Sequence, residues 1–175
     1  MFSSQSHLLK IVKYHYPKLQ EPILFTGTIA ENIRFGKEAS DQEVEDMLIA
    51  VGGQKLLDKL ENGINEHVTR KGGNLSLGEK QLISFARILI SNPSIVIMDE
   101  ATANIDTETE EMIVKALDVI AKDRTVIVIA HRLSTIVRSD KIVVLDYGQL
   151  VEEGNHKELL ALDGKYANMY RAQIG

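Results

Sequence analysis

The sequence predicts an α/β fold in which short apolar strands alternate with helices, and three observations support this prediction. The strand candidates Ser94–Met98, Thr125–Ile129 and Lys141–Leu145 are nearly continuous apolar runs. Such runs are typical of strands covered on both faces, as in a parallel sheet. A helix-start pattern lies between the first two of these strands, and residues 28–93 show helical patterns but no strong strand. We therefore expect one α/β domain with a helical insertion ahead of the strand–helix core.

Capping boxes, in which Ser or Thr is followed three residues later by Glu, mark the predicted helix starts. Three such boxes occur, at Ser40–Glu43, Ser76–Glu79 and Thr107–Glu110. Each box opens a run whose apolar residues recur at helical spacing. Two glycines follow the first run and Pro93 follows the second, which are both signals that end a helix.

Composition excludes several classes of function. The chain has 175 residues, 44% of them apolar and 26% charged, with a formal net charge of -5. Such a balance is ordinary for one globular domain and disfavours nucleic acid as a partner. No cysteine is present, so disulfides and thiolate metal sites are excluded. Apolar runs are too short for a membrane span and no signal-peptide pattern occurs, so we expect a cytosolic domain that reaches a membrane only through a partner.

Two strand ends carry side chains suited to phosphate chemistry. Asp99 and Glu100 follow one apolar strand, and His131 follows the next one along the chain. Ligands bind at the carboxyl ends of parallel strands, where Asp99 suits Mg²⁺ and Glu100 suits the orientation or deprotonation of water. An imidazole at the same edge is suited to contact a terminal phosphate. Taken singly, the Asp-Glu pair fits a solvated strand end equally well, and a lone histidine after a strand is more often structural than catalytic.

A third motif, NLSLGEKQ at residues 74–81, places Gly78 beside a helix start. The free N–H groups and positive potential of a helix N-terminus make it an anion site in principle. The box between Ser76 and Glu79 also explains the motif as an ordinary capped helix, so by itself it favours the structural interpretation.

Together, these motifs resemble the ATP-binding domain of the ABC-transporter family. In that family LSGGQ opens a helix, and the Walker B strand, the D-loop and the switch histidine follow in this order. QEPILFTGTIAENI precedes them here and ATANID follows the Walker B carboxylates, while GTIAENI and the ending GQLVEEGNHKELLALDGKYANMY resemble exporter-type members. The resemblance covers residues 20–175 nearly continuously.

The resemblance implies roles for the residues that match on the strand side of the site. Glu100 would be the general base for the attacking water, and His131 would sense or stabilise the γ-phosphate. Asp99 would help to hold Mg²⁺. Gln20, which matches the Q-loop glutamine, would reach both metal and water and link them to the helical insertion.

Other matches imply a partner. Ser76, Leu77, Gly78 and Glu79 stand for the signature, whose Ser76 and Gly78 would contact the γ-phosphate of ATP bound on a second, facing ATPase domain. Asp106, in the D-loop, would communicate across that interface. Family members work as head-to-tail pairs, as homo- or heterodimers, that close on ATP and drive a transmembrane partner at the inner face of the membrane. Leu77 and Glu79 depart from LSGGQ by added bulk and added negative charge.

The P-loop of the family, GxxGxGK[ST], is missing from this sequence. Gly36-Lys37 and Gly164-Lys165 are its two Gly–Lys pairs, and neither precedes Ser or Thr. The residues ahead of Gln20 are too few for a strand of ~5–6 residues, a glycine loop, a helix of ~11–12 residues and a second strand. The sequence thus predicts a partial ABC ATPase domain, truncated before the Q-loop. Its segments are a divergent N-terminus (1–19), a helical subdomain (28–93) and a Walker B to C-terminal core (94–175).

In fold terms this is an incomplete P-loop NTPase (RecA-like) core with a helical ABC-signature subdomain, without the P-loop strand and the N-terminal antiparallel strands. Without the missing strand, Thr125–Ile129 would lose one neighbour, and an apolar strand left at a sheet edge invites aggregation. We hypothesise that Leu8–Val12 (LLKIV) partly fills the gap.

Three functions follow from these expectations. The first is the ATP-binding and ATP-hydrolysing part of an ABC exporter, although the missing P-loop puts the activity of this chain alone in doubt. The second is a module without catalytic activity that lends its Ser76 helix to the ATP site of a partner. The third is an ABC ATPase of DNA repair or translation, which the exporter-like motifs and the lack of basic patches oppose.

Overall fold

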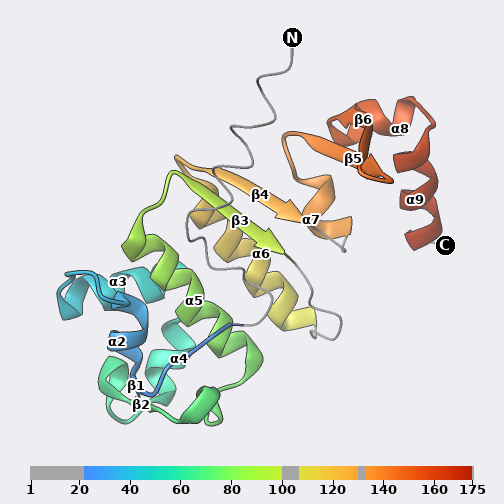
Figure 1. Ribbon diagram of the computed structural model, residues 1–175. Helices are drawn as coiled ribbons and strands as arrows, with labels where there is room; N and C mark the ends of the chain where they lie inside the picture. Colours follow the sequence, from blue (N-terminus) through green and yellow to red (C-terminus); the bar gives the residue numbers. More distant parts are fainter. Residues whose placement is uncertain (1–21, 100–106, 130–132, 175) are drawn as a thin grey trace. The chain divides into compact units, whose positions relative to one another are not determined.

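The computed structural model describes residues 22–99, 107–129 and 133–174 (Figure 1). The chain divides into two compact units, one that ends at Ile129 and one that begins at Ala130.

The first part of the N-terminal unit is mostly helical. Its two strands, β1 and β2, have two residues each and pair antiparallel, with Gly27 opposite Val68. In chain order its elements are β1 (Gly27–Thr28), α2 (Ile29–Arg34), α3 (Asp41–Ala50), α4 (Gln54–Lys59), the 3-10 helix η1 (Gly63–Asn65), β2 (His67–Val68), the 3-10 helix η2 (Arg70–Gly72) and α5 (Leu77–Ser91).

Capping boxes start these helices as predicted. The Ser40 box opens α3, where the Glu43 amide donates to Ser40 Oγ at 3.2 Å and the Ser40 amide donates to Glu43 Oε2 at 2.7 Å. The Ser76 box opens α5 in the same way. Two more boxes, which the sequence analysis did not single out, start α2 at Thr28 and α8 (His156–Ala161) at Asn155. The helix predicted after the third box is α6 (Thr107–Ala121), whose first side chains lie outside the described ones.

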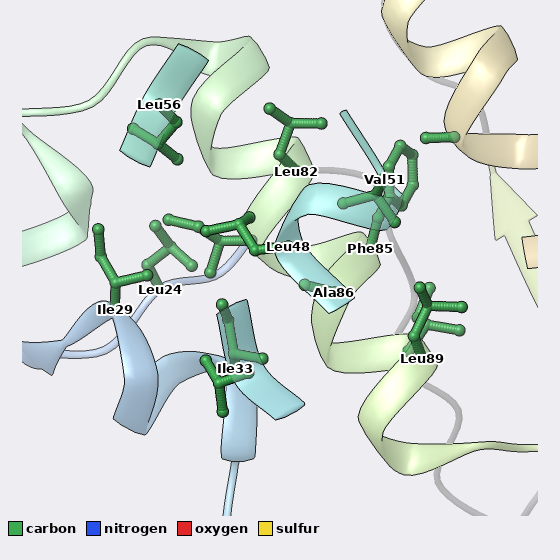
Figure 2. Packing of buried hydrophobic residues seen from close by; sticks show 14 of the residues in the cluster. Leu24, Ile29, Ile33, Leu48, Val51, Leu56, Leu82, Phe85, Ala86 and Leu89 are labelled. Carbon is green, nitrogen blue, oxygen red and sulfur yellow. The ribbon is translucent and has the colours of Figure 1, made fainter. Parts of the chain in front are cut away.

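The core of this unit forms around α5, because that helix buries residues at helical spacing (Figure 2). Leu82, Phe85, Ala86 and Leu89 recur at i, i+3, i+4 and i+7. They pack against apolar residues of α2, α3 and α4 and the C-cap residue of α3, namely Ile29, Ile33, Leu48, Val51 and Leu56. Phe85 is completely buried, so α5 acts as the central support of the helical part.

A parallel strand pair follows, and it differs from the prediction in its exposure. β3 (Ile95–Asp99) and β4 (Thr125–Ile129) pair in parallel, and α6 packs on one face of the pair (Figure 1). Val96 and Met98 are buried, whereas Ile127 is 43% and Ile129 is 53% exposed. The expectation that both faces are covered was wrong for β4, because only one face meets the described helices. The Leu8–Val12 hypothesis lies outside the described residues.

The C-terminal unit corrects a second expectation about strands. It contains α7 (Leu133–Val137), β5 (Ile142–Asp146), β6 (Gln149–Gly154), α8 (His156–Ala161) and α9 (Lys165–Ile174). The predicted strand Lys141–Leu145 forms β5 but pairs antiparallel with β6 and is buried only at alternate residues. Tyr147 and Gly148, with φ of 47° and 77°, make the connecting turn of the kind that two-residue hairpins favour.

His156 is half-buried in the C-terminal unit. Its Nδ1 lies 2.7 Å from the Tyr166 hydroxyl, and its ring lies 5.0 Å from the ring of Tyr170, measured between centroids. Burial, with the nearby Tyr170, raises the pKa of Tyr166. The histidine therefore belongs to the packing between α8 and α9.

Candidate functional site

The predicted site residues fall into two groups in the structure. The four signature residues Ser76–Glu79 are described in full, at the start of α5. Asp99 ends β3, but its side chain is not described. Four more predicted site residues lie outside the described residues, namely Gln20, Glu100, Asp106 and His131.

A tight loop presents the signature. Asn74 closes it, because its Oδ1 accepts from the Thr69 amide and hydroxyl at 3.1 and 3.0 Å and its Nδ2 donates to the His67 carbonyl at 2.9 Å. Gly72 adopts a φ of +65°, and a Cβ there would lie 2.9 Å from Lys80 Cε. A larger residue at Gly72 would therefore be strained and crowded. These contacts set the conformation of the loop that leads into α5.

At the start of α5, Ser76 is exposed and caps the helix. Its Oγ accepts from the Glu79 amide at 3.2 Å, and its own amide donates to Glu79 Oε2 at 2.7 Å. Gly78 is buried and Leu77 is 45% exposed. Leu77 therefore adds bulk on the accessible side of the helix start, as the sequence had indicated. The fifteen-residue helix presents its positive end here, an arrangement that attracts anions.

Glu79, the departure from the family glutamine, does not carry an unbalanced charge. Its Oε1 lies 2.9 Å from Lys59 Nζ at the end of α4. Burial by itself would raise the pKa of Glu79, but the Lys59 ammonium and the Ser76 amide and hydroxyl outweigh that effect, so the pKa lies below its usual value. The carboxylate therefore folds back onto Ser76, as the capping box predicted.

The paired strands β3 and β4 end at the same edge of the sheet. The register pairs Asp99 with Ile129, so β3 and β4 end side by side. Glu100 follows the first strand directly and His131 follows the second after one residue. The backbone thus supports the expectation that the chain leaves both strands at one edge. Within the described residues, no group of three or more His, Asp or Glu is placed to hold a metal ion.

Sequence reasoning missed Arg87, which fixes the segment that follows Gln20. Arg87 is 8% exposed; its Nε donates to the Asn32 carbonyl at 2.8 Å, and both Nη atoms donate to the Ile23 carbonyl at 3.2 Å. Burial lowers the pKa of Arg87. Its guanidinium carbon also lies 4.8 Å from the centroid of the Phe35 ring. The signal was present, since Arg87 is the one charged residue within Leu82–Ile90.

Asn32 completes this anchor. It is 3% exposed, its Oδ1 accepts from the Phe25 amide at 2.8 Å, and its Nδ2 donates to the Phe25 carbonyl at 2.9 Å. The segment Pro22–Phe25 is therefore tied to both α2 and α5.

A parallel strand pair in which β3 ends in Asp99, preceded by a helical segment with LSLGE at a helix start, is the arrangement expected of an ATP-binding domain of the ABC type. The family model for ABC transporter matches residues 6–103, more than half of the chain. The chain belongs to the ABC transporter family.

Curated relatives and a solved structure agree with this assignment. The chain is 56% identical over 158 residues to the probable multidrug resistance ABC transporter ATP-binding/permease protein YheH of Bacillus subtilis (strain 168), covering 90% of this chain and 24% of that protein. It is 53% identical over 156 residues to the uncharacterized ABC transporter ATP-binding protein YknV of the same organism, covering 89% and 26%. The chain therefore spans about a quarter of the length of these relatives.

The structural match is to a bacterial Atm1-family ABC exporter solved with ATP bound. The TM-score is 0.79 at 42% sequence identity, over 90% of this chain and 28% of that one. The α/β fold of an exporter ATP-binding domain is thereby confirmed. Among the described helices of this chain, none combines the length and the apolar character that crossing a membrane requires.

Proposed function

We propose that this chain is the ATPase part of an ABC exporter subunit, which energises transport together with a second ATPase domain and a transmembrane partner at the cytoplasmic face of a membrane. The observation that carries the proposal is the exposed Ser76 at the capped N-terminus of α5. Its support is the identity of 56% to a protein named as an ATP-binding/permease protein.

The signature half of the site is the contribution that the described residues support best. The start of α5 offers backbone N–H groups and the Ser76 hydroxyl, and buried Gly78 adds no side chain there. In a head-to-tail pair, these donors would meet the terminal phosphate of ATP held on the facing domain. Asp106 would lie in the same interface.

Hydrolysis by this chain itself is the second part of the proposal. Asp99 ends β3, and Glu100 and His131 follow the paired strand ends. A carboxylate oxygen at Asp99, with the amide oxygen of Gln20, is the kind of donor that Mg²⁺ prefers. Magnesium would supply charge neutralisation at the phosphates. Glu100 would accept the proton of the attacking water, and His131 would donate a hydrogen bond to the terminal phosphate.

We infer a candidate surface for the transmembrane partner next to the Arg87 anchor. Ile23, Phe25 and Phe35 are 63%, 50% and 55% exposed, and the two phenylalanine rings stack at 5.5 Å between centroids. Exposed aromatic pairs on a rigid base are typical of protein interfaces. Because YheH is named as an ATP-binding/permease protein, we propose that the permease part of such a protein covers this patch. Phe35→Ser should then weaken assembly with the permease part in a pull-down assay. Circular dichroism should show that the helical fold of this variant persists.

The experiment is titration of Mg-ATP by calorimetry into the purified chain, with and without the ATP-binding part of YheH. Glu100→Gln blocks hydrolysis, and Ser76→Arg blocks the signature without touching the strand edge. We expect no binding to the chain alone. With the YheH domain present, we expect tighter ATP binding that Ser76→Arg abolishes. Equal binding with Ser76 and with Arg at this position would refute the proposed signature role.

The outcome also separates the two remaining candidates. A module without catalytic activity would raise ATP affinity of the YheH domain while Glu100→Gln leaves the phosphate release of the mixture unchanged. If this chain hydrolyses ATP, Glu100→Gln should lower the phosphate release of the mixture. Micromolar binding to the chain alone would assign a phosphate site to the residues ahead of Gln20.

A further inference from the structure

We propose that Lys59 is a positioning residue of the signature site, because its pairing with Glu79 keeps the N-terminus of α5 attractive to phosphate in a chain where glutamate replaces the family glutamine. This inference rests on the proposed function of Ser76. It concerns a residue twenty positions away from the signature, on a different helix.

The geometry divides the Glu79 carboxylate between two donors. Oε2 accepts from the Ser76 amide at 2.7 Å, and Oε1 faces Lys59 Nζ at 2.9 Å. The Glu79 side chain is 17% exposed, whereas that of Lys59 is 62% exposed. Each Glu79 carboxylate oxygen therefore has its own hydrogen-bond donor, and Lys59 approaches from the solvent side.

The electrostatic consequence concerns the anion that α5 would receive. Glu79 lies in the first turn of the helix, so its negative charge opposes the positive end of the helix for any incoming phosphate. A bound ammonium at hydrogen-bond distance makes the pair neutral as a whole. Glutamine would need no such partner, which explains why the requirement arises with Glu79 and not with the family residue.

Lys59 is not needed to hold α4 in place. The helix is anchored by Leu56, which is 3% exposed within the core, and by the contacts of α4 with η1. Replacing the exposed ammonium should leave that anchoring intact. A loss of phosphate attraction in a Lys59 variant would then report on charge and not on folding.

The experiment is a double-mutant cycle on the full chain, with Lys59→Met, Glu79→Gln and the double variant. Each is added to the ATP-binding part of YheH carrying arginine at the position that aligns with Ser76, and the Kd for Mg-ATP is measured by calorimetry. Lys115→Met, an exposed lysine of α6, is the matched control, and thermal melts check the fold. We expect Lys59→Met to weaken ATP binding by about three- to tenfold. In the Glu79→Gln background, the same change should alter the Kd by less than about twofold.

Equal losses in both backgrounds, or no loss at all, would overturn the inference while leaving the proposed function standing. A wild-type chain that fails to tighten ATP binding would instead refute the proposed function and, with it, the role of Lys59 toward phosphate. A second readout tests the pairing without a partner. The pKa of Glu79, followed by carbon NMR, should rise when Lys59 is replaced by Met, and an unchanged pKa would overturn the inference.

Discussion

Replacing Arg87 by Met should destabilise the helical part of the N-terminal unit by about 2–4 kcal/mol. Met retains the aliphatic stem, so the change removes mainly the guanidinium and its bonds. One strong hydrogen bond runs to the Asn32 carbonyl at 2.8 Å, and two longer ones share the Ile23 carbonyl at 3.2 Å. A hydrogen bond from a charged donor contributes about 1.5–3 kcal/mol, and the cation–π contact with the half-exposed Phe35 ring adds about 0.5–1 kcal/mol.

The assay is urea unfolding followed by far-ultraviolet circular dichroism, since the chain has no tryptophan. With a slope of about 2 kcal/mol/M, the midpoint should fall by about 1–2 M. Arg171→Met is the control, because Arg171 pairs with Asp163 at the surface with side chains 54% and 72% exposed. An exposed pair contributes about 0–1 kcal/mol. A fall no larger for Arg87→Met than for Arg171→Met would refute the view that Arg87 anchors the segment after Gln20.

Three further changes test other parts of the structure. The pKa of Glu79 is lowered on folding. Its contribution to stability is therefore present above the usual glutamate pKa and is lost as the pH falls through the lowered value. In urea titrations at decreasing pH, the wild type should lose more stability than Glu79→Gln. Gly53→Ala should lower the free energy of unfolding by about 1–3 kcal/mol, because the new Cβ would lie 2.6 Å from the Leu48 carbonyl oxygen. Gly73→Ala is the control and should be near neutral in the same assay, because its Cβ would lie 3.4 Å from the nearest atom. Ile127→Lys should reduce concentration-dependent light scattering with little change in melting temperature, because the Ile127 side chain is 43% exposed on β4. Unchanged scattering would show that this face of β4 does not drive association.

Local features of this protein could be predicted from the sequence because they depend on neighbouring residues. The Ser40 and Ser76 boxes satisfy backbone donors within three residues, so a short pattern is enough to predict α3 and α5. The β-branched runs at β3, β4 and β5 were also located to within a residue. The back-folding of Glu79 onto Ser76 belongs to this class. The ordered motifs likewise predicted the family that the comparisons confirmed.

Tertiary structure alone decided the features that join distant parts of the chain. Arg87 meets the Ile23 carbonyl across 64 residues and Lys59 meets Glu79 across 20, and no local pattern determines which pairs of a folded chain come together. The apolar run of β5 predicted a strand but not its antiparallel partner β6. The exposure of Ile127 depends on what covers the second face of a sheet, and an apolar run carries no information about that cover. The sequence thus determined the secondary-structure elements and the chemistry of the signature. Tertiary packing decided that Lys59 is the residue that neutralises Glu79.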